Sequence, residues 1–91
     1  MTYEQYLLTC LAEECNEVAQ RAIKAARFGL FETQPGHTQD NKFRLEEELG
    51  DLLGVMAMLG LVPDPQKMVG KSDRVNKYYA YSKKCWENNL T

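Results

Sequence analysis

The chain has 91 residues, of which 44% are hydrophobic and 26% are charged, and its formal net charge is -2. This length predicts one domain spanning residues 1–91, with so limited a core that oligomerisation would be a reasonable way to add apolar contacts. The mildly acidic charge argues against a nucleic-acid-binding surface. No apolar run approaches the roughly 20 residues that a membrane-spanning helix needs.

The cysteine and histidine content limits the kinds of active site that the chain could form. Cys10, Cys15 and Cys85 are odd in number and lack metal-ligand spacing, which fits reduced thiols in a cytoplasmic protein. No basic segment followed by an apolar one begins the chain, so we expect no signal peptide. His37 is the only histidine. A catalytic triad or a histidine-rich metal site is therefore not expected.

The first predicted helix covers residues 3 to about 28. Thr2 is a suitable N-cap, and Gln5, three residues later, completes the pattern of a capping box. No Gly or Pro interrupts the segment before Gly29, which is a natural stop. The apolar stripe of this helix consists of Leu7, Leu11, Val18, Ala22 and Ala25.

The second predicted helix runs from about residue 42 to 60, after a polar loop over residues 30 to about 42. Asp40 or Asn41 can cap it. Gly50 and Gly54 are four residues apart, and we expect them to let another backbone approach closely. The apolar stripe consists of Leu45, Leu49, Leu52, Met56 and Leu59.

The third predicted helix covers about residues 65 to 87. Asp64 is its expected N-cap, and Pro65 suits its first position. An approximate inner face contains Met68, Val75, Tyr78 or Tyr79, and Ser82. Three helices without a convincing strand pattern predict an all-α fold.

Both of the first two predicted helices carry carboxylates at or beside their apolar stripes. Glu48 and Asp51 are three residues apart and share one side of the second helix. Glu14 lies on the apolar stripe of the first helix, and Glu17 follows three residues later. Ionised carboxylates beside a core are costly unless they are paired or bind a metal.

Three explanations of these acids remain open at the level of the residues. They could form solvated helix faces, since Glu is a strong helix former; they could pair with Lys24, Arg27 or Arg44; or they could share a cation. A site made only of carboxylates suits Mg²⁺, with Mn²⁺ as a substitute. Because Mg²⁺ in such sites commonly coordinates phosphate groups, a phosphate ester or phosphoanhydride would be the expected substrate.

Basic residues on the first and third predicted helices fit a phosphorylated substrate. They could meet the phosphate groups of a nucleotide, or they could be exposed solubilising charges. These residues are Lys24 and Arg27 on the first helix, and Lys71, Arg74 and Lys77 on the third. The chain has no Walker loop, so nucleotide binding would depend on metal and side chains.

The acidic motifs resemble those of the MazG-like all-α nucleoside triphosphate pyrophosphohydrolases. Glu13-Glu14-x-x-Glu17 followed by Glu48-x-x-Asp51 matches their EExxE and ExxD signature, and Arg27-Phe28-Gly29 resembles the short phage and mobile-element members. The clear resemblance covers about residues 10 to 60 and is weaker over the third helix.

The resemblance implies a three-helix protomer that completes a four-helix bundle by assembling into homo-dimers or homo-tetramers. It also implies Mg²⁺-dependent hydrolysis of an NTP or dNTP to the monophosphate and pyrophosphate. By matching position, the metal ligands would be Glu14, Glu17, Glu48 and Asp51. Glu13 and Glu47 would be second candidates, for an additional ion or for orienting the water. The pyrophosphate charge would be held by cations among Lys24, Arg27, Lys71 and Arg74.

Two other functions are compatible with the sequence. A related helical hydrolase acting on a phosphoribosyl-type metabolite could use a similar acidic site. A non-catalytic helical dimerisation module would carry the same acids as solvated charges.

Overall fold

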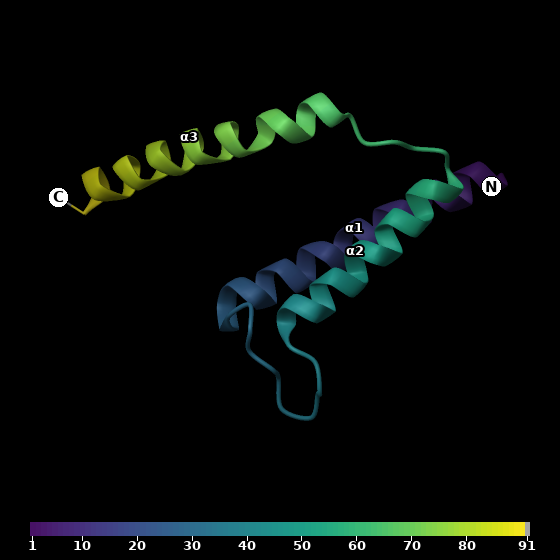
Figure 1. Ribbon diagram of the computed structural model, residues 1–91, viewed down its shortest axis with the longest axis horizontal. Helices are drawn as coiled ribbons and strands as arrows, with labels where there is room; N and C mark the ends of the chain where they lie inside the picture. The colour runs from purple at the N-terminus through teal and green to yellow at the C-terminus, as the bar shows by residue number, and fades with distance from the viewer. Residues whose placement is uncertain (91) are drawn as a thin grey trace.

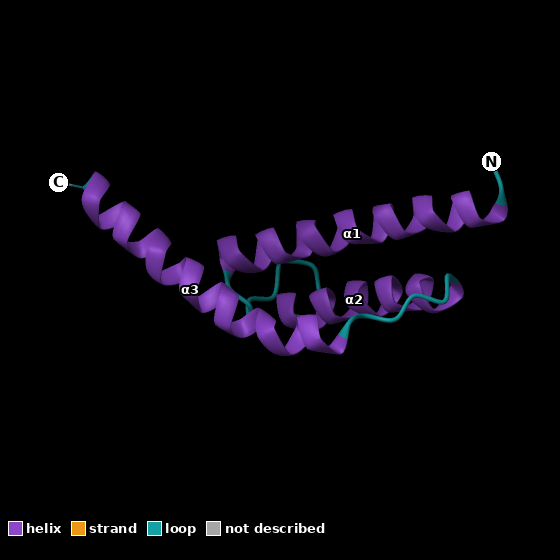
Figure 2. Cartoon of the chain, turned by 90° about the horizontal axis from the view of Figure 1, so that it is seen from above, coloured by secondary structure: helices purple, strands orange, loops and turns teal. Residues whose placement is uncertain are grey.

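Three helices make up the computed structural model, which describes residues 1–90, and they confirm the predicted all-α fold (Figure 1). They are α1 (Tyr3–Phe28), α2 (Asn41–Met58) and α3 (Pro65–Asn89). Residues 1–90 contain no strand (Figure 2). Thr91, which the predicted domain 1–91 includes, lies outside the described residues. Within the described chain, no helix combines the length and apolarity needed to cross a membrane.

The ends of α1 confirm the predicted capping chemistry. The Thr2 hydroxyl oxygen accepts a hydrogen bond from the Gln5 backbone N–H at 3.1 Å, and the Gln5 side chain accepts one from the Thr2 N–H at 2.8 Å. This reciprocal pair satisfies two backbone groups at the start of the helix. Gly29 ends the helix with a φ of 106°, a region that L side chains rarely adopt.

The other two helices also begin at predicted caps. The Asp40 carboxylate accepts from the Phe43 N–H at 2.8 Å, and the Asp64 carboxylate accepts from the Gln66 N–H at 2.9 Å. Pro65 occupies the first turn of α3, where its missing N–H costs nothing. α2 ends at Met58, slightly before the predicted end, and α3 continues to Asn89, beyond the predicted end at about 87.

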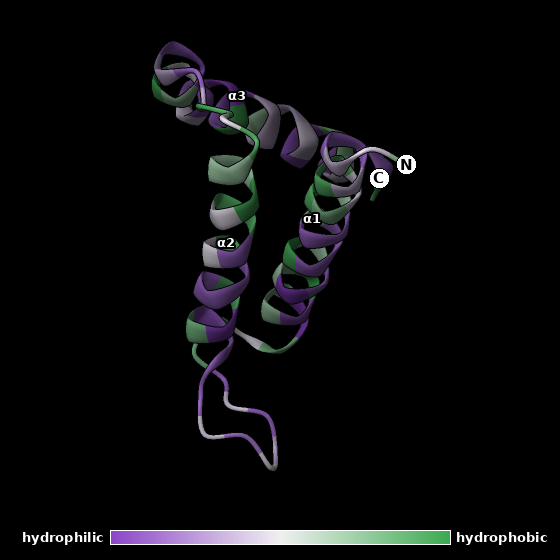
Figure 3. Cartoon of the chain, turned by 90° about the vertical axis from the view of Figure 1, so that its right-hand side faces the viewer, coloured by the Kyte–Doolittle hydropathy of each residue, from purple (hydrophilic) through white to green (hydrophobic). Residues whose placement is uncertain are grey.

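α1 and α2 form an antiparallel hairpin (Figures 1 and 3), and α3 packs against neither of them (Figure 1). The radius of gyration is 17.1 Å, whereas about 12 Å is typical of a compact domain of this length. Leu7 is the only buried hydrophobic residue in the described chain. The apolar stripe of α2 is half-buried at Leu45, Leu52, Met56 and Leu59, and Leu49 is exposed. The hairpin therefore has a seam of partly covered apolar residues rather than a closed core.

Asn41, the first residue of α2, fastens the loop to the hairpin. Its side chain is 1% exposed. The Asn41 amide nitrogen donates to the Gly29 carbonyl at 2.8 Å and to the Glu32 carboxylate at 3.2 Å, while the Asn41 backbone N–H donates to the Glu32 carbonyl at 3.0 Å. These bonds join the end of α1 to the start of α2 across the loop.

Two sequence predictions about packing are wrong within this chain. A Cβ atom added at Gly50 or Gly54 would meet nothing within 4 Å, so no backbone approaches there. The reason is that both glycines lie on the side of α2 that faces away from α1. The predicted inner face of α3 is also exposed, with Met68 65%, Val75 50% and Tyr78 69% accessible, because no helix packs on it.

Replacing Asn41 tests whether it fastens the hairpin. Asn41→Ala removes the two side-chain hydrogen bonds to the Gly29 carbonyl and the Glu32 carboxylate, so we expect the free energy of unfolding to fall by about 1–3 kcal/mol. Urea unfolding followed by circular dichroism measures this. Asn16→Ala, at an exposed position of α1, is the matched control and should change stability by less than about 0.5 kcal/mol. Equal effects of the two substitutions would contradict the assignment.

Candidate metal centre

Three of the predicted metal ligands come together where α1 and α2 pack. Glu14 from α1 and Glu48 and Asp51 from α2 each offer one carboxylate oxygen, and these oxygens all lie within 4.8 Å of one another. The antiparallel pairing produces this arrangement, because Glu14 is near the middle of α1 and Glu48 is near the middle of α2. Glu14 and Glu48 are half-buried, and Asp51 is exposed. We call these three residues the acidic triad.

The other predicted acids lie around the triad. Glu17 is exposed and does not belong to the group of oxygens within 4.8 Å. Its charge, together with that of Glu13, still acts on Glu14. Glu13 and Glu47 are exposed on α1 and α2 respectively. The structure therefore brings three of the six predicted acids together. The other three are exposed and lie within three residues of a triad member in the sequence.

The carboxylates of the triad repel one another. Partial burial raises the pKa of Glu14 most, and the negative charges of Asp51 and Glu48 raise it further, followed by those of Glu17 and Glu13. Among residues 1–90 the single salt bridge joins Lys42 to Glu46 at 2.7 Å. The internal ion pairs with Lys24, Arg27 or Arg44, one of the open explanations, are thus not formed. A divalent cation would offset the repulsion, and donors that are all oxygen suit a hard ion such as Mg²⁺ or Mn²⁺.

The four predicted substrate-binding cations are not gathered at the triad within one chain. Lys24 is half-buried on α1, and the Arg27 guanidinium lies 5.9 Å from the centre of the Phe28 ring. Lys71 and Arg74 belong to α3, which does not pack on the hairpin. The Arg74 side chain donates to the Lys67 carbonyl of its own helix at 3.1 Å.

Another basic residue, Arg21, was not among the sequence candidates. It is half-buried on α1, and its Nη1 atom is fully buried without a hydrogen-bond partner. The signal in the sequence was its spacing, because Arg21 follows Glu14 by seven residues and returns to nearly the same helix face. The buried Asn41 Oδ1 atom also has no partner.

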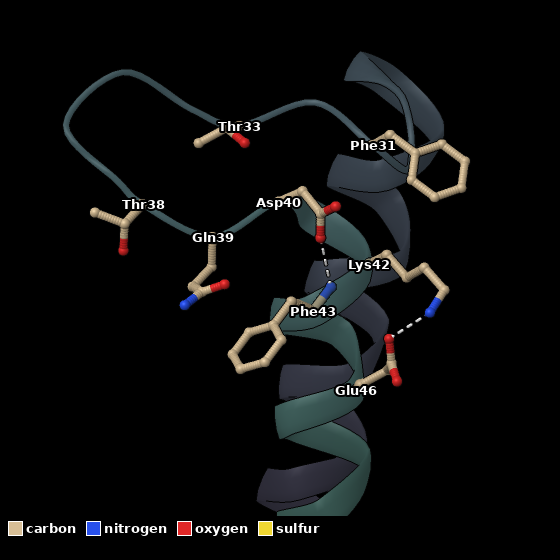
Figure 4. A pocket seen from close by; sticks show the side chains of 8 residues that line it. All are labelled: Phe31, Thr33, Thr38, Gln39, Asp40, Lys42, Phe43 and Glu46. Atoms are coloured by element: carbon tan, nitrogen blue, oxygen red, sulfur yellow. Dashed lines mark hydrogen bonds and ion pairs between the residues drawn. The ribbon is translucent and has the colours of Figure 1, made fainter.

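The loop and the start of α2 enclose a separate surface pocket of about 370 Å³ (Figure 4). It contains the Asp40 cap and the Lys42–Glu46 salt bridge. Its lining residues are Phe31, Thr33, Thr38, Gln39, Asp40, Lys42, Phe43 and Glu46. None of the triad residues lines it, so this pocket is distinct from the candidate metal centre.

Residues 2–77 match the family model described as the MazG nucleotide pyrophosphohydrolase domain. The match spans α1, α2 and the first half of α3, and therefore includes every predicted site residue. No curated protein and no solved structure matches the chain significantly.

The raised pKa of Glu14 predicts how stability depends on pH when no metal is bound. The folded state favours the protonated carboxyl, so the stability due to Glu14 is greatest below its ordinary pKa of 4.5 and falls as the pH rises through the raised value. Glu14→Gln is always neutral. We expect it to raise the melting temperature at pH 7 in EDTA and to reduce the loss of stability between acidic and neutral pH.

Thermal unfolding at pH 4 to 7, followed by circular dichroism, checks this prediction. Glu87→Gln removes one exposed carboxylate from α3 and is the control, which should leave the pH profile unchanged. A lower melting temperature for Glu14→Gln than for the parent in EDTA would contradict the repulsion described above.

Proposed function

The chain belongs to the MazG nucleotide pyrophosphohydrolase domain family, and we propose that it hydrolyses a nucleoside triphosphate or deoxynucleoside triphosphate to the monophosphate and pyrophosphate in the presence of Mg²⁺. The observation that carries this proposal is the acidic triad, whose oxygens lie within 4.8 Å of one another. Family membership supports nucleotide pyrophosphohydrolase chemistry in general, and the donor set supports Mg²⁺.

The proposed metal ligands are Glu14, Glu48 and Asp51, with Glu17 as a fourth. Glu17 follows Glu14 by three residues on an exposed part of α1, so a change of side-chain rotamer would suffice to bring its carboxylate nearer. A bound Mg²⁺ would neutralise charge on the phosphate oxygens and make the α-phosphorus more susceptible to attack.

Glu13 and Glu47 are the proposed groups for handling the water. Both are exposed, and each neighbours a triad residue in sequence. In the proposed reaction a water oxygen forms a bond to the α-phosphorus, and one of these carboxylates accepts the proton that the water loses. The bond from the α-phosphorus to the bridging oxygen breaks, and pyrophosphate leaves with the electron pair.

Cations of the chain would hold the charge that develops on pyrophosphate. Lys24 and Arg27 lie on α1, towards the loop from the triad. Lys71 and Arg74 lie on α3, so their contribution depends on how α3 is placed in an assembly. We propose that the assembly is a homo-dimer or homo-tetramer, in which helices of a second copy complete a four-helix bundle.

The exposed surface supports this assembly. The chain exposes 7490 Å², which is about 2,000 Å² more than is typical of a compact monomer of its 10.5 kDa mass. Large apolar side chains on all three helices contribute to the excess. They include Tyr6, Ile23, Leu53, Met58, Val75, Tyr79 and Trp86, each at least half accessible. A second copy is the partner that is always present at matching concentration.

Removing one ligand should abolish activity without unfolding the protein. Glu48→Gln and Asp51→Asn keep the side-chain size but weaken the metal site, so we expect Mg²⁺-dependent pyrophosphate release to fall by about two orders of magnitude or more. The assay measures pyrophosphate from a panel of NTPs and dNTPs with and without Mg²⁺. Circular dichroism checks the helix content.

The matched control is Glu46→Gln, on the same helix and with the same change of charge but paired with Lys42 outside the triad. It should retain activity. Full activity of Glu48→Gln or Asp51→Asn would overturn the ligand assignment. Silence of the parent protein across the panel, with no change in melting temperature on adding Mg²⁺, would favour a non-catalytic dimerisation module.

Assembly is tested by the mass in solution. Light scattering after size-exclusion chromatography should give at least twice the 10.5 kDa of one chain. Val75→Lys places a charge on the exposed apolar side of α3 and should shift the equilibrium towards the monomer. Lys77→Gln, two residues away on the same helix, should not. A monomeric parent protein at micromolar concentration would contradict the proposal.

A further inference from the structure

Arg21 is a charged residue in the hairpin whose role the metal centre does not explain. Its side chain is half-buried, and Nη1 is fully buried without a hydrogen-bond partner. The guanidinium of an arginine is positively charged and carries only hydrogen-bond donors. An unpartnered buried donor of a charged group is destabilising. The hairpin, with Leu7 as its one buried hydrophobic residue in the described chain, has little packing energy to offset that cost.

The position of Arg21 relates it to the acidic triad. Seven residues separate Arg21 from Glu14, which places the two within about 20° on the helix surface and roughly 10 Å apart along the axis. Val18 and Ala25, the neighbouring positions on this face, are half-buried like Glu14 and Arg21. All four therefore lie on the side of α1 that contacts α2. Arg21 lies between the triad and the loop end of the hairpin, which Asn41 fastens.

Two roles are compatible with a cation at this place. Arg21 could be a counter-ion that stabilises the acidic cluster, or it could bind an anionic group of the substrate. The first role predicts an ion pair with Glu14, Glu48 or Asp51. Within residues 1–90 the one salt bridge joins Lys42 to Glu46 instead, and the buried Nη1 donor has no acceptor. The geometry favours the second role.

We propose that Arg21 binds the β- and γ-phosphates of the substrate and the pyrophosphate that leaves, an inference that rests on the proposed function. The planar guanidinium offers donors in a fork that matches phosphate oxygens, and such charge-assisted pairs are strong. With the α-phosphate at the triad, the phosphate chain then extends along the hairpin towards its loop end. Arg21 thereby orients the substrate for departure of pyrophosphate rather than of a single phosphate.

The two roles predict opposite changes in protein stability when Arg21 is replaced by an apolar residue, so an experiment can distinguish them. Replacing an unpartnered buried charge by an apolar side chain of similar length is neutral or stabilising, whereas removing a counter-ion from an acidic cluster is destabilising. Arg21→Met is the informative substitution. In EDTA and without ligand, its melting temperature should equal or exceed that of the parent protein.

The binding experiment uses inorganic pyrophosphate and a nucleoside monophosphate as separate probes. Isothermal titration calorimetry in Mg²⁺ should show pyrophosphate affinity weakened about tenfold or more in Arg21→Met, with monophosphate affinity little changed. Arg21→Lys keeps the positive charge without the planar fork of donors. Its pyrophosphate affinity should lie between those of the parent protein and Arg21→Met. Lys83→Met removes one exposed positive charge from α3 and is the control, which should bind both probes as the parent does.

Three results would overturn the role of Arg21. They are a lower melting temperature of Arg21→Met in EDTA, equal weakening for pyrophosphate and monophosphate, or no measurable binding of pyrophosphate to the parent protein. Failure of the proposed function is distinguishable from these. A parent protein that binds pyrophosphate through Arg21 but releases none from any NTP or dNTP would refute the reaction and leave the anion site supported.

Discussion

Repulsion among three carboxylates in the contact between α1 and α2 is the constraint on which the rest of the structure depends. Glu14, Glu48 and Asp51 place oxygens within 4.8 Å of one another, and the negative charges of Asp51 and Glu48 add to the effect of partial burial in raising the pKa of Glu14. The described chain opposes this cost with a short apolar seam, capped helix ends and the hydrogen bonds of Asn41. On the outer face of either helix the same carboxylates would be solvated and farther apart, so their position in the contact is the feature that the proposed metal site would explain.

The unpacked third helix and the sparse core have one common physical explanation. α3 begins at a well-formed cap and continues for 25 residues, yet none of its residues is buried. Isolated helices in water are only marginally stable, because most helical stability in proteins comes from packing an apolar face. The proposed assembly would supply the contacts that three long helices lack when only the α1–α2 seam is covered. Assembly would add packing to the hairpin that holds the triad, and fold stability would then be coupled to the proposed site.

Features set by local chemistry were predictable from the sequence. The boundaries of α1 follow from Thr2, Gln5 and Gly29, and the starts of α2 and α3 follow from Asp40 and Asp64, because caps act within one turn. The meeting of Glu14 with Glu48 and Asp51 could be anticipated from matching acidic spacings on two adjacent helices.

Features that depend on how helices face one another were not predictable. Gly50 and Gly54 have the spacing of a close helix contact, but helical periodicity does not say which side of α2 meets α1. The burial of Asn41 depends on how the loop returns, which single-residue preferences do not determine. Arg21 was overlooked because a charged residue on a half-apolar face looks like a surface residue whose stem is partly covered.

Metal binding and folding of the hairpin would be linked through the triad. A cation that binds the folded hairpin and not the unfolded chain stabilises it by mass action. The charge that Mg²⁺ would place between α1 and α2 would offset the repulsion among the three carboxylates in their contact. In the proposal above, Arg21, whose buried Nη1 atom has no hydrogen-bond partner, would bind the phosphate anion as the triad binds the cation. Cation and phosphates together would then complete the charge balance along one seam, with three acids at its middle and one arginine nearer the loop.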